Sequence, residues 1–128
     1  MPQAYRSGEL LIVIDCADLD RSARFWSDVL GYQAAPASGR YQSLYPPAGS
    51  GAGGAAIKVL LQLTGDAKTG KNRMHLDLHT ADLDAEVGRI LRCGATRVSA
   101  QPVSEDGSRW HVLADPDGNE FCVLQPPG

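Results

Sequence analysis

Polar side chains occupy every second position of one short segment of the chain, at His75, Asp77 and His79. Because an extended strand sends successive side chains to opposite faces of a sheet, this alternation predicts a strand over residues 74–80 with the polar groups on one face. The apolar side chains on the opposite face, which we expect to pack on helices, are Met74, Leu76 and Leu78. His and Asp at hydrogen-bonding distance form a general acid–base pair. Buried polar groups are costly unless satisfied, so three together indicate water or a polar ligand beside this face.

Other polar and aromatic residues are candidates for the same cavity. Asp15 and His111 could form a polar cluster with Asp77 and its neighbours. Alternatively, the two carboxylates cap loops or pair with Arg73 and Arg109, which is the ordinary role of such groups.

The two tryptophans differ in their predicted roles. Trp110 falls in a predicted strand, where an aromatic side chain in a cavity can stack on a planar ligand. Trp26 has helical spacing with Leu19 and Leu30, so we expect it to pack in the core. No Ser/His/Asp order, phosphate-binding loop or GxGxxG motif supports nucleophilic hydrolysis or nucleotide binding.

The elements that must position these groups are encoded twice. The residues Ala17–Asp20 return unchanged as Ala81–Asp84, an offset of 64 in a chain of 128 residues. Each copy follows a strand-like segment and precedes a helical one, which indicates one structural unit repeated inside the chain. At this offset His75 corresponds to Leu11, Asp77 to Val13 and His79 to Asp15.

Each half has the predicted pattern βαβββ. An Asp N-cap begins each helix and a Gly ends it, over residues 18–30 and 82–93. Strands are expected over 10–16, 32–36, 41–46 and 56–63 in the first half, and over 74–80, 95–99, 109–114 and 119–125 in the second. The sequence Asp115–Gly118 is typical of a turn that joins the last two strands as a hairpin. The fold class is therefore α+β, with one module over about residues 8–64, a linker over 65–72 and a second module over 73–126, all within a single domain, 1–128.

Composition limits the partners of this domain. The three cysteines, Cys16, Cys93 and Cys122, have no paired spacing and are expected to be reduced thiols of a cytoplasmic protein. A net charge of -3 without basic clusters argues against nucleic-acid binding. No apolar run approaches the roughly 20 residues of a membrane helix, so we expect no membrane partner.

The chain contains the two segments DLDRSARFWSDVLGY and LADPDGNEFCVLQPP. In having both, it resembles members of the vicinal oxygen chelate superfamily. This superfamily includes glyoxalase I, bleomycin-resistance proteins and extradiol dioxygenases, and GKNRMHLDL is similar to its glyoxalase-like members. The resemblance implies a curved mixed sheet with helices on its convex side, and a concave face that holds a ligand or a divalent metal. It also implies a homodimer.

The resemblance implies four metal ligands, on the first and last strands of each module, and few of them are present here. His75 matches the ligand that opens the second module, whereas its symmetry mate Leu11 has no donor atom. The family's glutamate on the last strand is replaced by Cys122, and Gln62 is the one plausible donor on the corresponding strand of the first module. We therefore expect a degenerate site without a tight metal requirement, in which His75 is the best candidate ligand and a divalent metal remains possible.

The leading hypothesis is a small-molecule-binding protein of the glyoxalase/bleomycin-resistance type, with no catalytic residue assigned. The expected ligand-binding residues are Asp15, Gln62, His75, Asp77, Trp110 and Cys122, with the Gly-rich loop 47–56 near the mouth of the cavity. The alternative is a metal-dependent lyase, isomerase or dioxygenase of the same superfamily that uses His75, Cys122 and Gln62. A purely structural or regulatory module is the third possibility.

Overall fold

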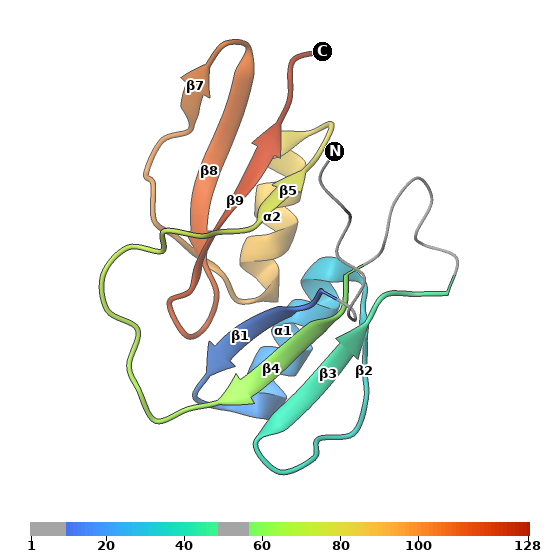
Figure 1. The fold of residues 1–128 in the computed structure, drawn as a ribbon. Coiled ribbons are helices and arrows are strands. Elements are labelled where there is room, and N and C mark those ends of the chain that lie inside the picture. Colours follow the sequence, from blue (N-terminus) through green and yellow to red (C-terminus); the bar gives the residue numbers. More distant parts are fainter. Residues whose placement is uncertain (1–9, 49–56) are drawn as a thin grey trace, which may run out of the picture.

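The protein consists of two modules of similar topology (Figure 1). The structure is a computed structural model that describes residues 10–48 and 57–128. The first module consists of β1 (Ile12–Cys16), α1 (Leu19–Leu30), β2 (Gln33–Ala34), β3 (Tyr41–Tyr45) and β4 (Val59–Leu63). Its sheet has the order β1-β4-β3-β2, in which β1 and β4 are parallel and the other pairs antiparallel. The expected loop 47–56 falls largely outside the described residues.

The second module repeats this plan with one additional strand. It consists of β5 (Asp77–His79), α2 (Leu83–Cys93), β6 (Thr96–Arg97), β7 (Val103–Glu105), β8 (Ser108–Ala114) and β9 (Glu120–Gln125). Its sheet has the order β5-β9-β8-β6, with β7 paired to β8. The predicted α+β class and the repeated strand–helix–strand order are confirmed, and each module has its own sheet.

Both helices begin and end where the sequence predicts. Asp18 and Asp82 are N-caps whose side chains accept hydrogen bonds from the backbone N–H of the third residue beyond, which satisfies one free donor in each first turn. Gly31 ends α1 at φ 70° and Gly94 ends α2 at φ 119°, a backbone region that favours glycine. None of the described helices is long and apolar enough to cross a membrane.

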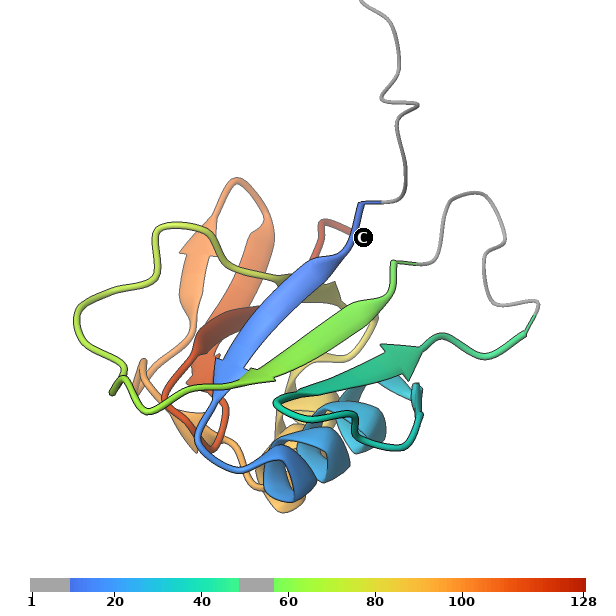
Figure 2. The same cartoon turned by 60° about the horizontal axis from the view of Figure 1, so that its bottom comes forward.

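The core lies between the two helices and the sheet faces that they cover. In Figure 2, α1 lies beneath β1, β4 and β3, with α2 beside it. Three aromatic rings connect the modules: Trp26 and Phe25 of α1 contact Phe121 of β9 at ring-centroid distances of 5.1 and 6.2 Å. All three side chains are at most 2% exposed, so the core is shared by both halves.

The predicted strand over 74–80 is shorter in the structure, because only residues 77–79 pair with β9. Leu76 and Leu78 pack against the core as expected. The expectation for Met74 is wrong, since this side chain is 90% exposed. The pairing with β9 reaches back only to the Leu76 carbonyl, so the alternation of faces does not extend to Met74.

The second module contains a strand that the sequence analysis missed. The segment Val103–Glu105 forms β7, which pairs with β8 through a tight turn at Asp106 and Gly107. The predicted hairpin at Asp115–Gly118 is confirmed, since β8 and β9 are antiparallel and the Gly118 N–H donates to the Asp115 carbonyl at 2.9 Å.

Candidate functional site

One group of potential metal donors is present in the described part of the chain, and it lies in the second module. The donor atoms of His75, Asp77 and Cys122 all lie within 4.8 Å of one another. The His75 Nδ1 and an oxygen of Asp77 form a hydrogen bond of 3.0 Å. The two side chains are 41% and 40% exposed, so the group is accessible from solvent. We call these three residues the donor cluster.

Strand pairing explains why these residues meet. In the parallel pair of β5 and β9, Asp77 lies beside Cys122, and neighbours in register point to the same face. The Cys122 N–H donates to the Leu76 carbonyl at 2.8 Å. This hydrogen bond joins β9 to the residue that precedes β5 and holds together the two segments that carry the cluster. His75 precedes β5 and is held by its hydrogen bond to Asp77.

The environment of Cys122 keeps its thiol protonated near neutral pH. Burial raises the pKa of this thiol, and the Asp77 carboxylate raises the pKa further through its charge and a hydrogen bond. The thiol and the His75 ring therefore both interact with the same carboxylate. Such an arrangement gives Asp77 the central position in the donor cluster.

Trp110 lies on the same sheet face as the donor cluster. In the antiparallel pair of β8 and β9, Val112 opposes Cys122 and Trp110 opposes Leu124. Because side chains alternate along each strand, Trp110 shares the face of Cys122, and it is half-buried. We call this surface, which carries Asp77, Cys122 and Trp110 and is directed away from α2, the open face.

Two of the predicted site residues lie elsewhere. Asp15 and Gln62 are neighbours in register in the sheet of the first module, on β1 and β4. They are therefore close to each other, but neither belongs to the donor cluster. Within one chain, the structure brings together His75, Asp77 and Cys122 with Trp110 on the same face.

The possible metal ligands predicted from the sequence are His75, Cys122 and Gln62, without Asp77. The signal for Asp77 was available, because the alternation already placed its carboxylate beside His75. Its contact with Cys122 depends on the parallel register of β5 and β9.

The predicted polar cluster that included His111 does not form in the cavity. His111 opposes Val123, which is fully buried, so its ring lies on the helix-covered face. The side chain is 5% exposed, and its Nδ1 has no hydrogen-bond partner among the residues that the structure describes. The one-residue offset from Trp110 is the reason, because adjacent residues of a strand point to opposite faces.

We expect His111 to make the fold sensitive to acid. Burial lowers the pKa of His111 below its usual 6.5, and the charge of Arg97 lowers it further. The neutral ring therefore contributes stability that is complete above the unfolded-state pKa of about 6.5 and is lost as the pH falls below it toward the folded-state value.

In urea denaturation at several pH values, the His111→Gln variant should lose less of its free energy of unfolding than wild type across this window. The exposed His79 provides the matched control, since His79→Gln should follow the wild-type profile. Identical profiles for wild type and His111→Gln would exclude this origin of the pH dependence.

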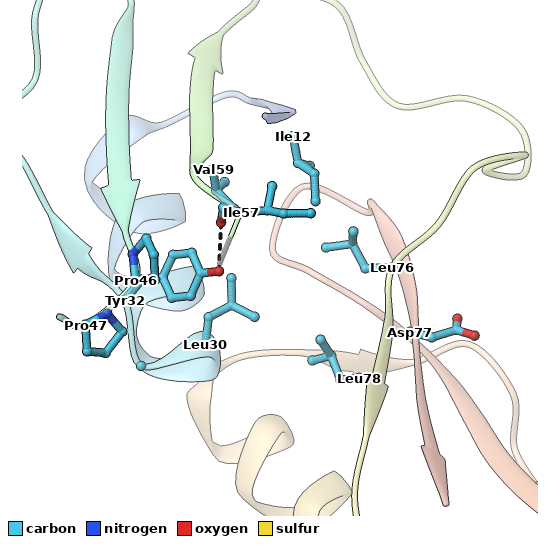
Figure 3. A pocket seen from close by; sticks show the side chains of 11 residues that line it. Ile12, Leu30, Tyr32, Pro46, Pro47, Ile57, Val59, Leu76, Asp77 and Leu78 are labelled. Carbon is cyan, nitrogen blue, oxygen red and sulfur yellow. Dashed lines mark hydrogen bonds between the residues drawn. The ribbon is translucent and has the colours of Figure 1, made fainter. Parts of the chain in front are cut away.

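A separate apolar pocket of about 570 Å³ lies between the modules. Side chains from the first module line it together with Leu76 and Leu78 of the second, and Figure 3 shows both leucines directed into it. The Asp77 carboxylate points away from this pocket (Figure 3). Asp77 therefore belongs both to the lining of the pocket and to the donor cluster, with its carboxylate directed to the cluster.

Solved structures of several bacterial proteins have the same fold. The hypothetical protein SA1046 from S. aureus has a TM-score of 0.69 at 18% identity, with 94% of this chain and 95% of that chain covered. A mutant of the fosfomycin resistance protein FosX from Listeria monocytogenes, complexed with Mn(II) and 1S,2S-dihydroxypropylphosphonic acid, has a TM-score of 0.69 at 18% identity, covering 93% of this chain and 90% of that one. A glyoxalase/bleomycin resistance protein from Albidiferax ferrireducens T118 has a TM-score of 0.64 at 22% identity, covering 91% and 96%.

At identities this low, the structural similarities show the fold alone. A comparison with curated protein sequences gave no significant match. The sequence model of the family described as the glyoxalase-like domain, however, matches residues 11–124, which is most of the chain. The chain therefore belongs to the glyoxalase-like domain family, within the vicinal oxygen chelate superfamily.

Proposed function

We propose that the protein binds a small molecule on the open face of the second module, without needing a metal. The observation that carries this proposal is the convergence of His75, Asp77 and Cys122 on one accessible surface that also carries Trp110. A few converging polar groups beside an aromatic wall are the usual form of a small-molecule site.

The geometry gives each side chain a role in this binding. Asp77 accepts a hydrogen bond from the Nδ1 of His75 when that nitrogen is protonated, which leaves the other ring nitrogen of His75 directed to a ligand. Trp110 offers a half-buried aromatic surface on which a planar group can stack. Cys122 supplies a neutral thiol at the base of the face.

A thermal-shift screen of planar anionic and aromatic compounds should yield a ligand for this face. We expect His75→Ala and Trp110→Ala each to weaken its binding by about tenfold, the equivalent of about 1.4 kcal/mol. The control is Arg24→Ala on the exposed side of α1, which should bind as wild type does. A compound that bound wild type and both site variants equally would not occupy the open face.

A second candidate function, a metal-dependent lyase, isomerase or dioxygenase, is favoured by the short distances within the donor cluster. Imidazole nitrogen, carboxylate oxygen and thiolate sulfur are all ligands of divalent transition metals, and His75, Asp77 and Cys122 supply one of each. The FosX relative was complexed with Mn(II). A bound metal would supply Lewis-acid polarisation of a substrate oxygen.

The residues of this chain fit a metal only in part. The donor cluster offers three donors, while Leu11 offers none and Gln62 lies in the other sheet. Native mass spectrometry of protein purified without chelator separates the two candidates, because a co-purified metal favours the second and a co-purified organic molecule alone favours the first.

We also propose that two copies of the chain associate. Exposed apolar and aromatic side chains lie on the sheet of the first module, with Val13 49%, Tyr41 43% and Tyr45 46% exposed. A second copy that covered this sheet with its own open face would bring Asp15 and Gln62 to the donor cluster and complete the six-residue site. Sedimentation velocity is expected to show a dimer, and a monomer at micromolar concentration would refute the association.

The free thiols support a reducing compartment, and we propose the cytoplasm. Cys16, Cys93 and Cys122 are all unpaired, and Cys16 and Cys122 are buried. Such thiols persist where glutathione and thioredoxin keep cysteines reduced.

A further inference from the structure

The core of the protein is incomplete at the place where α1 ends. Among the described residues, eight apolar side chains pack against the core but remain partly exposed. Five of the eight line the pocket between the modules, namely Ile12, Leu30, Tyr32, Leu76 and Leu78. In Figure 3, Ile12 and Leu30 are directed into this pocket from the first module, and Leu76 and Leu78 from the second. The incompletely covered part of the core is therefore concentrated in one place.

The corresponding place in the second module is filled by an aromatic ring. At the end of α2, the ring of Phe25 lies 3.8 Å from the position at which a side chain of Gly94 would begin. At the end of α1, no described atom apart from the chain neighbours lies within 4 Å of the same position at Gly31, which lines the pocket. The two helices end alike, at a glycine with positive φ, so the difference comes from what packs beside each end.

The internal repeat explains this difference. At the offset of 64 residues, the counterpart of Phe25 is Arg89. The guanidinium of Arg89 donates to the carbonyls of Asp28 and Val29 in the last turn of α1, at 3.0 and 2.9 Å. Where the second module has a ring beside its glycine, the first has a guanidinium that is bound to the helix end. The space beside Gly31 is thus left to a ligand.

The lining determines which kind of molecule fits. An apolar cavity of about 150 Å³ is large enough to hold benzene, and this pocket has a volume of about 570 Å³. It therefore has room for two aromatic rings. The one charged side chain of the lining, Asp77, directs its carboxylate away from the pocket (Figure 3). An ionic ligand would lose its hydration here without gaining a partner of opposite charge, so the pocket favours an uncharged molecule.

One polar atom of the lining adds a preference. The Tyr32 hydroxyl donates to the Ile57 carbonyl at 2.7 Å, and a hydroxyl oxygen that donates can still accept a hydrogen bond. Figure 3 places this oxygen among the apolar side chains, close to Ile57. A ligand with one O–H or N–H group can donate to Tyr32 while its rings contact the leucines.

We propose that the pocket between the modules is a second ligand site, which takes an uncharged aromatic molecule that carries one hydrogen-bond donor. Burial of apolar surface supplies the affinity, and the Tyr32 oxygen orients the ligand. The site goes beyond the function proposed above, because it uses other side chains, selects for a different charge and requires neither a metal nor a second copy of the chain.

The probe is 2-naphthol, which has two rings, one hydroxyl group and no charge at neutral pH. In ¹H–¹⁵N NMR spectra of the wild-type protein, this compound should shift the backbone amide signals of Tyr32, Ile57, Leu76 and Leu78. The anion 2-naphthoate has the same rings and should bind at these residues at least about tenfold more weakly. Shifts confined to β8 and β9 around Trp110 would assign 2-naphthol to the open face and overturn the proposal, as would the absence of shifts.

A filled pocket should exclude the probe. Ile57→Trp adds volume at a partly exposed position of the lining and should weaken 2-naphthol binding by at least about tenfold. The matched control is Val13→Trp, since Val13 follows Ile12 on β1 and is 49% exposed on the opposite face. This control should bind 2-naphthol as wild type does. Equal affinity in Ile57→Trp and wild type would contradict the site.

The hydroxyl of Tyr32 is tested by a pair of ligands. Tyr32→Phe should weaken binding of 2-naphthol by about threefold to tenfold and leave the binding of naphthalene, which has no hydroxyl, unchanged. This comparison supplies the test if Ile57→Trp does not fold, which its NMR spectrum reveals. An equal loss for both ligands would exclude the proposed hydrogen bond. Ligand binding to the open face is judged separately, by His75→Ala and Trp110→Ala, so each site can fail without the other.

Discussion

Replacing Asp115 by Ala is expected to lower the free energy of unfolding by about 3–5 kcal/mol. This carboxylate is 3% exposed and accepts four hydrogen bonds. One oxygen accepts from the backbone N–H groups of Asp117 and Asn119 at 2.9 and 2.8 Å. The other accepts from Trp26 Nε1 and Asn119 Nδ2, both at 3.0 Å.

The size of this loss follows from the donors that remain after the substitution. Burial raises the pKa of Asp115 while the hydrogen bonds oppose that shift, so the ion is tolerated because its donors are in place. The alanine variant leaves these buried donors without an acceptor, at about 1–3 kcal/mol each where water cannot reach them.

Urea denaturation measures the effect, with Asp66→Ala at an exposed linker position as the control that should change stability by less than about 0.5 kcal/mol. Asp115→Asn retains one acceptor oxygen and should lose less than Asp115→Ala. A loss below about 1 kcal/mol in Asp115→Ala would show that the network around Trp26 does not hold the two modules together.

Replacing Phe121 by Ala is expected to cost about 3–5 kcal/mol, because it leaves a cavity at the junction of the modules. The ring is 1% exposed and lies 5.1 Å from Trp26, centroid to centroid. Its backbone directly precedes Cys122, so the same change should also loosen the donor cluster.

The matched control for Phe121 is Tyr41→Ala, an aromatic truncation at a side chain that is 43% exposed. This variant should lose less than about 1 kcal/mol as a monomer. Equal losses at the two positions, measured by urea denaturation, would refute a core role for Phe121.

Local signals in the sequence predicted most of the fold. Asp18 and Asp82 as N-caps and Gly31 and Gly94 as C-terminal residues located both helices, because capping depends on a few neighbouring residues. The missed strand β7 had its own signal, since Asp-Gly at 106–107 favours a tight hairpin turn. Its short, exposed sequence lacks the apolar alternation on which the other strands were predicted.

The site was predicted less completely, because it depends on pairing between distant segments. Alternation placed His75 and Asp77 on one face, but only the register of β5 and β9 brings Cys122 to Asp77. No local pattern in the sequence predicts the distance between the two modules. In the structure, Gln62 lies in a different sheet from the donor cluster. The error at His111 is different, because alternation along its own strand already places it on the opposite face from Trp110.

The short strand β5 has a practical consequence for protein engineering. Leu78 of β5 and Leu76 just before it line the pocket between the modules, and Asp77 between them belongs to the donor cluster on the other side. A library that enlarges the pocket by varying Leu76 or Leu78 therefore also moves the backbone that carries Asp77. The volume of the pocket and the position of the Asp77 carboxylate therefore change together, so mutant libraries should vary the two faces of this segment together.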